Sequence, residues 1–163
     1  MAQPNEEALK RAKTVIVTAL GKGTIEPVMQ IIKFGFPIND PIMDCGVNLL
    51  MHVSAAENLT SADLQEILTL NPDLNAKDNI GRTALHFACR AGMPERVSML
   101  ADNEDCDVDV TTNAGVTPLM MAVESGQMQV VVACLNSNLN PFMKDALDRN
   151  ALDYGEHYRN VLG

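Results

Sequence analysis

The sequence predicts an all-α fold in which antiparallel helix pairs, joined by hairpin-like loops, stack into a solenoid. The first observation is a block at residues 81–88 that is answered by residues 115–122, so that its glycine recurs after 34 residues (115 − 81). The second is a further glycine after each block, Gly92 and Gly126, followed by an apolar run, as expected for two helices joined by a turn. The third is composition: 47% of the residues are apolar but only 4% are aromatic, which suits close-packed helices.

The two blocks resemble the signature of the ankyrin repeat, Thr-Pro-Leu-His-x-Ala, which recurs with a period of about 33 residues. Residues 117–122 read Thr-Pro-Leu-Met-Met-Ala, and residues 83–88 read Thr-Ala-Leu-His-Phe-Ala. The resemblance implies an ankyrin-repeat solenoid, a fold that carries out no chemistry and instead presents a surface. It also implies that His86 bridges neighbouring repeats by hydrogen bonding.

The first two repeats are the most divergent. The first, at residues 8–43, shows only the second half of the pattern, because residues 23–35 fit the family's G-x-x-E-x-V-x-x-L-L-x-x-G. The second, at residues 44–76, lacks both the Thr and the Pro of the signature. A longer loop separates its two helices, and we expect Thr60 or Ser61 to cap the second of them.

The third repeat, at residues 77–109, and the fourth, at residues 110–143, carry the clearest pattern. Thr83 and Thr117 stand just before apolar runs, where a hydroxyl can cap the N-terminus of a helix. Pro118 then falls at the first helical position, where its missing N–H costs nothing.

The last segment, at residues 144–163, is a partial repeat that closes the C-terminal end. Asp148 takes the place of the glycine and Leu152 that of the signature leucine. Because the outer faces of a solenoid must be polar or capped, we expect the charged residues near both termini to shield its ends. The chain is therefore predicted to be a single ankyrin-repeat domain spanning residues 1–163.

The charge and the cysteines exclude several classes of partner and location. The chain carries 12 Lys and Arg against 21 Asp and Glu, a net charge of −9, so we expect neither nucleic acid nor a membrane surface as its partner. The apolar stretch at residues 14–20 is far shorter than the roughly 20 residues of a membrane span, and the start lacks the basic residues of a signal peptide. Cys45, Cys89, Cys106 and Cys134 match no zinc spacing. We expect reduced thiols, which indicate a cytoplasmic or nuclear location.

No motif indicates catalysis, a cofactor or a metal site. The acidic loop at residues 102–109 opens like a calcium-binding loop, but valine stands at both discriminating positions, 110 and 116. Residues 21–24 read Gly-Lys-Gly-Thr without the first glycine of a phosphate-binding loop. A ligand- or metal-dependent sensor that uses the acidic loop stays open as a third class of function.

The resemblance places the binding site on the concave side of the solenoid, formed by the hairpin tips and the first helix of each repeat. Arg82 and Arg90 would form a pair of fork-shaped donors suited to carboxylates. Ile80 and Leu147 would add apolar groups at exposed tips. The expected partner-binding residues, carried over position by position, are Asp44, Cys45, Val47, Asn79, Ile80, Arg82, Arg90, Asn113, Val116, Glu124, Leu147, Arg149 and His157.

We therefore expect a non-enzymatic protein–protein interaction module that is monomeric when free. It would bind another protein as an adaptor, or as an inhibitor or regulator that acts by occupancy. A rigid, preformed surface loses little entropy on association, which suits this role. The alternative is a structural subunit of a larger assembly, packed through its helical ends. Large apolar ends would support that alternative, and the charged termini argue against it.

Overall fold

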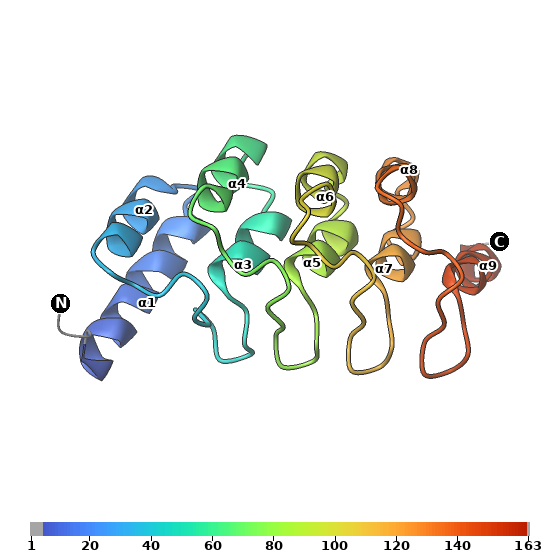
Figure 1. The fold of residues 1–163 in the computed structure, drawn as a ribbon, viewed down its shortest axis with the longest axis horizontal. Coiled ribbons are helices and arrows are strands. Elements are labelled where there is room, and N and C mark those ends of the chain that lie inside the picture. The colour runs from blue at the N-terminus through green and yellow to red at the C-terminus, as the bar shows by residue number, and fades with distance from the viewer. Residues whose placement is uncertain (1–4, 163) are drawn as a thin grey trace.

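The computed structural model describes the backbone of residues 5–162 and the side chains of residues 5–156. The described residues form nine α-helices: α1 (Glu6–Gly21), α2 (Glu26–Lys33), α3 (Leu49–Ala55), α4 (Ser61–Leu68), α5 (Ala84–Ala91), α6 (Pro94–Ala101), α7 (Pro118–Glu124), α8 (Met128–Asn136) and α9 (Ala151–Leu162). Helices α1 to α8 form four antiparallel pairs, and α9 follows as a single helix (Figure 1). Within residues 5–162 the only β-type pairing is an isolated bridge between Pro41 and Asn48. The prediction of an all-α solenoid is confirmed.

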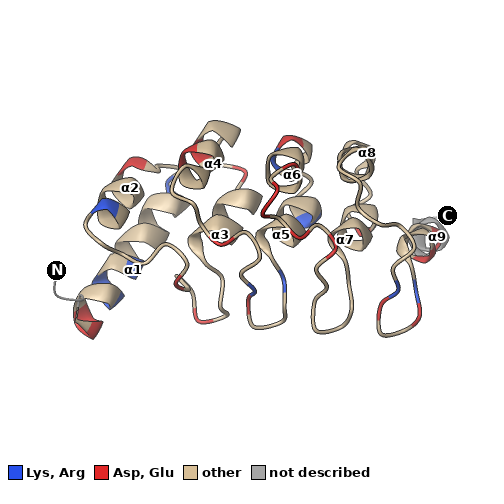
Figure 2. Cartoon of the chain, in the orientation of Figure 1, with Lys and Arg blue, Asp and Glu red and all other residues tan. Residues whose placement is uncertain are grey.

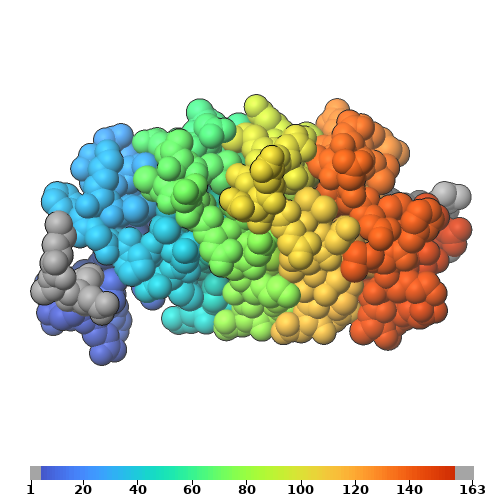
Figure 3. Space-filling model, viewed as in Figure 1, coloured from blue at the N-terminus to red at the C-terminus, as the bar shows by residue number. Residues whose placement is uncertain are grey.

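The helices lie in two rows. Helices α1, α3, α5, α7 and α9 form one row and α2, α4, α6 and α8 the other, and the hairpin loops before α3, α5, α7 and α9 project to the same side (Figure 1). Successive units lie side by side along one axis, so each packs mainly against its neighbours (Figure 3). Among the helices of residues 5–162, none combines the length and the apolar character needed to cross a membrane.

Helices α4, α5 and α7 begin directly after threonines that the sequence predicts as caps. The Thr117 hydroxyl accepts a hydrogen bond from the third residue of α7, which itself begins with Pro118. At α4 the cap is Thr60, whose hydroxyl accepts from the Asp63 N–H at 3.2 Å while the Asp63 carboxylate accepts from the Thr60 N–H at 2.6 Å. This reciprocal pair is a capping box, which satisfies two N–H groups that the first turn leaves free. Helix α5 follows Thr83.

Backbone hydrogen bonds join each hairpin loop to the loop before it. The N–H groups of Asn79, Asn113 and Ala146 donate to the carbonyl oxygens of Cys45, Ile80 and Ala114 at 3.1, 2.9 and 2.9 Å. Gly81 is required in this ladder, because its φ is +86° and a Cβ there would lie 2.8 Å from the backbone nitrogen of Asn113. The loops therefore form a continuous ladder with a defined spacing.

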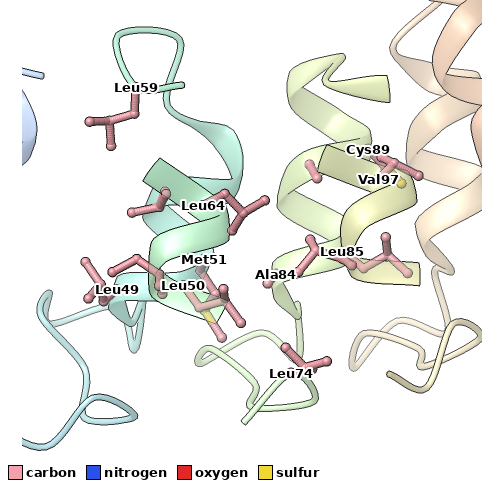
Figure 4. Packing of buried hydrophobic residues seen from close by; sticks show 14 of the residues in the cluster. Leu49, Leu50, Met51, Leu59, Leu64, Leu74, Ala84, Leu85, Cys89 and Val97 are labelled. Atoms are coloured by element: carbon pink, nitrogen blue, oxygen red, sulfur yellow. The ribbon is translucent and has the colours of Figure 1, made fainter. Parts of the chain in front are cut away.

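Stacking buries one continuous apolar core. Leu50, Leu85 and Leu119 occupy the same position in successive first helices, and each is only 1% exposed. Figure 4 shows Leu50 and Leu85 in this core together with side chains of the neighbouring helices. Since the adjacent unit covers each leucine, a single helix pair could not bury this core without its neighbours.

A buried arginine links the second and third helix pairs. The Arg96 guanidinium of α6 donates to the carbonyl oxygens of Val53 at 2.9 Å and Ala56 at 2.8 Å, and also to that of Leu59. These carbonyls belong to the end of α3 and to the longer loop that follows it. Because helix C-termini leave their carbonyls without intrahelical partners, Arg96 satisfies groups that would otherwise be buried without hydrogen bonds.

Candidate functional site

Most of the residues expected to bind a partner lie on one face, which we call the hairpin face. It comprises the hairpin loops before α3, α5, α7 and α9 and the outward side of α3, α5 and α7. Its exposed members among the expected residues are Asp44, Cys45, Asn79, Ile80, Arg90, Asn113, Glu124, Leu147 and Arg149. The side chain of His157 lies outside the described residues.

Besides the half-buried Arg82, two of the expected tip residues are not exposed. Val47 is only 5% exposed and packs in the core, because the chain turns inward after Gly46 to start α3. Val116 is half-buried, and its carbonyl oxygen accepts a hydrogen bond from His86 Nε2 at 3.0 Å. The expectation of an exposed tip is therefore wrong for both, since the residue after each glycine belongs to the base of its loop.

Arg82 is already engaged within the molecule. Its Nε and Nη2 both lie 2.7 Å from Oδ2 of Asp78, whose side chain is 1% exposed. The guanidinium also lies over the Phe87 ring, 4.5 Å from its centroid. Because the Arg82 guanidinium already binds Asp78 and lies over Phe87, Arg82 stabilises its own loop. It is therefore not free to bind a partner carboxylate together with Arg90.

The same device recurs at the last loop. Arg149 Nε and Nη2 donate to Oδ2 of Asp145 at 3.0 and 2.7 Å, and the Tyr154 hydroxyl donates to the same oxygen at 2.8 Å. Burial alone would raise the pKa of Asp145, but the hydrogen bonds from Arg149, Tyr154 and the backbone N–H of Leu147 outweigh it and hold the pKa well below its ordinary value. Arg149 is therefore also a loop-holding residue, although it is more exposed than Arg82.

Two asparagines at the tips connect neighbouring loops. The Asn79 amide donates to the carbonyl oxygen of Asp44 at 3.2 Å, and the Asn113 amide donates to that of Asn79 at 3.3 Å. These bonds run alongside the backbone ladder, so both side chains keep the hairpins at a fixed spacing. The tip side chains left free are then Asp44, Cys45, Ile80 and Leu147.

The sequence reasoning missed a column of side chains on the first helices. His52, Phe87 and Met121 occupy equivalent positions in α3, α5 and α7, one residue after the buried Met51, His86 and Met120. All three are half-buried and lie between the hairpin loops and the exposed helix ends. The signal was available, because the variable position of the signature, between its histidine and its alanine, is less buried than its neighbours and varies from repeat to repeat.

Two hollows meet at Phe87. The first, of about 380 Å³, lies between α3 and α5 and is lined by Ala55, Arg82, His86, Phe87, Arg90 and Ala91. The second, of about 400 Å³, continues toward α1 and includes Met43, His52, Ala56, Asn58 and Phe87. Each is an open, largely apolar depression that can receive a side chain of a partner.

The first hollow carries one available cation. Helix α5 carries one basic residue, Arg90 (Figure 2). Arg90 is exposed and forms no ion pair among the side chains described for residues 5–156. Burial lowers the pKa of His52, so His52 is neutral near pH 7. The site therefore combines apolar walls and an aromatic ring with a single exposed guanidinium.

The acidic loop uses its carboxylates for a local turn and for a link to the loop of the next repeat. Asp107 accepts from the Asp109 N–H at 3.2 Å, and Asp109 accepts from the Asn140 N–H at 2.9 Å. Within the described residues, no three His, Cys, Asp or Glu side chains are grouped so that they could hold a metal ion.

Comparisons with known proteins agree with this architecture. A family model described as ankyrin repeats (3 copies) matches residues 50–145. Neurogenic locus notch homolog protein 1 of Homo sapiens is 29% identical over 111 residues, 68% of this chain and 4% of that protein. Its counterpart in Danio rerio is 30% identical over 107 residues, 66% of this chain and 4% of that protein. Neurogenic locus notch homolog protein 2 of Homo sapiens is 28% identical over 113 residues. The chain thus spans 4% of the length of these relatives.

Proposed function

The chain belongs to the ankyrin-repeat family, whose repeats generally mediate protein–protein interaction, and we propose that it binds a partner protein on its hairpin face. The role is that of an adaptor, or of an inhibitor or regulator that acts by occupancy. It involves no catalysis, as is general for the family, and no cofactor. The free protein is a monomer in the cytoplasm or nucleus, with neither nucleic acid nor a membrane surface as its partner. It is a single domain, 1–163, with repeats at 8–43, 44–76, 77–109 and 110–143 and a partial repeat at 144–163.

The observation that carries this proposal is the pair of hollows that meet at Phe87. A half-buried aromatic ring, flanked by depressions and rimmed by polar groups, has the character of an interaction hot spot. The ring is held in place by the guanidinium of Arg82, which the buried Asp78 fixes in turn. Because these groups are ordered before binding, little entropy is lost when a partner docks.

The charge next to the hollow favours a particular partner segment. Arg90 offers an exposed guanidinium at the rim, so a segment with an apolar side chain for the hollow and a carboxylate close to it would satisfy both. Asp44 at the neighbouring loop would disfavour a second carboxylate there. We therefore propose a partner segment with a single acidic group beside an apolar anchor.

The test is affinity capture from cells that express the protein, read by quantitative mass spectrometry. Wild type is compared with Arg90→Glu and with Lys33→Glu, a matched charge reversal at an exposed position of α2. A partner that uses the hairpin face is recovered by wild type and Lys33→Glu and is depleted about tenfold by Arg90→Glu. Equal recovery by all three proteins would place the binding site elsewhere.

Binding measurements with the purified partner then distinguish the contribution of the Phe87 ring from that of the Arg90 charge. Phe87→Ala should weaken binding in calorimetry by at least about tenfold, as expected for a central aromatic anchor. Because Phe87 also packs against Arg82, the variant's thermal unfolding must be recorded beside its affinity. Wild-type affinity in a folded Phe87→Ala protein would rule out the hollow as the site.

A further inference from the structure

The C-terminal end of the solenoid exposes a side chain that the rest of the stack buries. Leu152 of α9 occupies the repeat position of Leu50, Leu85 and Leu119, which are each 1% exposed, yet Leu152 is 66% exposed. In the earlier units the following first helix covers this leucine. In α9, by contrast, the described residues leave the equivalent leucine exposed. Of the charged residues expected to shield this end, Asp153 and Glu156 are exposed, and the side chains of His157 and Arg159 lie outside the described residues.

Helix α8 extends the apolar character of this end. It contains no charged residue, and Met128, Val132 and Leu135 form an exposed stripe along one side of it. Between α7, α8 and α9 lies a groove of about 300 Å³ that includes Val123, Val131, Leu135, Pro141 and Leu152. A contiguous apolar surface of this kind marks an interaction site.

The position of the groove indicates the shape of its occupant. Helix α6 packs against α4 and α5, and α8 packs against α6 and α7. The groove lies in the corresponding place beside α8 and α9, so the geometry of the stack is completed there by one more helix. The equivalent helices turn Val97 and Leu100 or Val130 and Ala133 toward the core. A helix with an aliphatic stripe therefore matches the shape of the groove.

The rim of the groove selects the charge of that helix. Glu156 lines the groove, and the exposed Glu124 and Asp153 follow groove residues on α7 and α9. The basic side chains described between residues 97 and 156 are Lys144 and Arg149, and both are already paired, with Asp148 and Asp145. Among residues 97–156, the unpaired charge beside the groove is therefore negative.

We propose that this groove, separate from the hairpin face, docks an amphipathic α-helix of a partner protein, with an aliphatic stripe flanked by Lys or Arg. The stripe would cover Leu135 and Leu152, and the basic flanks would face Glu124, Asp153 and Glu156. Helix-in-groove binding of this type draws its affinity from the apolar stripe and its selectivity from the complementary rim.

The test uses two synthetic helical peptides with the same Leu/Ala stripe, one with Lys and one with Glu on the polar face. Fluorescence anisotropy at physiological salt compares wild type with Leu152→Asp and with Phe34→Asp, an equally charged change at an exposed site in the N-terminal unit. The Lys peptide should bind wild type and Phe34→Asp with the same affinity. The Glu peptide should bind wild type at least about tenfold more weakly than the Lys peptide does. Leu152→Asp should bind the Lys peptide about tenfold more weakly than wild type.

The design separates docking from bulk charge attraction. Both Asp variants make the protein more negative, so a purely electrostatic attraction to the Lys peptide would strengthen in both. Equal binding by Leu152→Asp and Phe34→Asp, equal binding of the two peptides, or no binding of the Lys peptide to wild type at about 100 µM would each overturn the proposal. So would sedimentation of wild type as a dimer that Leu152→Asp dissociates, because a second copy would then cover the groove.

Discussion

His86 shows at the scale of a single residue how the repeats are joined. Its Nδ1 accepts a hydrogen bond from the Thr83 N–H at 3.1 Å, so the ring proton lies on Nε2, which donates to the Val116 carbonyl oxygen at 3.0 Å. The bridge between neighbouring repeats that the resemblance implied is confirmed. Burial lowers the pKa of His86 to about 4, although the hydrogen bond to Val116 opposes this shift.

This depressed pKa makes the stability of the protein depend on pH. In the unfolded chain a histidine titrates near about pH 6.5, so acidification favours the unfolded state between about pH 6.5 and pH 4. The buried histidine should remove up to about 3 kcal/mol from the free energy of unfolding across this window. Urea unfolding of wild type and His86→Met, which carries the side chain found at positions 51 and 120, measures the effect. Parallel pH profiles for the two proteins would contradict it.

Arg82 and Arg90 should behave differently when each is truncated. Arg82→Ala leaves the buried Asp78 carboxylate without its cation and should lower the free energy of unfolding by about 2 kcal/mol. Arg90→Ala removes an exposed side chain and should change it by less than about 0.5 kcal/mol. Chemical denaturation of the two variants side by side is the measurement. Equal destabilisation would show that the Asp78–Arg82 pair does not hold the loop.

At the scale of the hairpin element, close approach between loops sets the requirement for glycine. A Cβ at Gly81 would lie 2.8 Å from the Asn113 nitrogen, whereas Gly35, also at positive φ, has no neighbouring atom within 4 Å. Gly35→Ala should cost about 1 kcal/mol, the penalty of the backbone conformation alone. Gly81→Ala should cost about 1–3 kcal/mol more, because the rigid backbone of the next loop must shift. Thermal unfolding of both variants tests this, and equal losses would exclude a contribution from the ladder.

The elements themselves could be predicted because their signals are local. Thr60, Thr117 and Pro118 act within the turn of helix that they start, so sequence spacing is sufficient to place them. The leucine positions follow from the repeat, since each unit buries the same face against the next.

The candidate site was less predictable, because a side chain is available to a partner only if no neighbouring group of the folded protein already binds it. The sequence shows Arg82 as a donor at a tip, but it does not show that the Asp78 carboxylate, buried by the fold, already holds that guanidinium. It shows Val47 beside a tip glycine without showing that the chain turns inward there. Phe87 could have been found, since it stands at the variable position of the signature, which is only half-buried. The exposure of Leu152 could not be predicted either, because the repeat pattern assigns it the position of the buried Leu50, Leu85 and Leu119.

At the scale of the whole molecule, the N-terminal helix pair is the most weakly attached unit. Helices α1 and α2 pack mainly against each other, whereas α3, α5, α7 and α9 form an unbroken series of neighbours. Asn58 is the polar link to α1, because its amide donates to the carbonyl oxygens of Leu20 at 2.9 Å and Gly21 at 3.3 Å. A second bond, from the Asp73 N–H to Asn39 Oδ1 at 2.8 Å, joins the segment after α2 to the next repeat. In a solenoid, stability is close to a sum of unit and interface contributions, so a weak interface allows one unit to open alone.

We therefore predict that α1 and α2 unfold together before the rest of the solenoid. In native-state hydrogen exchange, amides of α1 and α2 should open with a lower free energy and a weaker dependence on denaturant than those of α5 and α7, because a partial opening exposes less surface. Asn58→Ala should lower protection in α1 and α2 further and leave α7 unchanged, since it removes the link and touches no interface beyond α3. Exchange of α1 and α7 with the same free energy and the same denaturant slope would instead mean that the interface at Asn58 is as strong as those between the central units, and that the solenoid unfolds as one cooperative body.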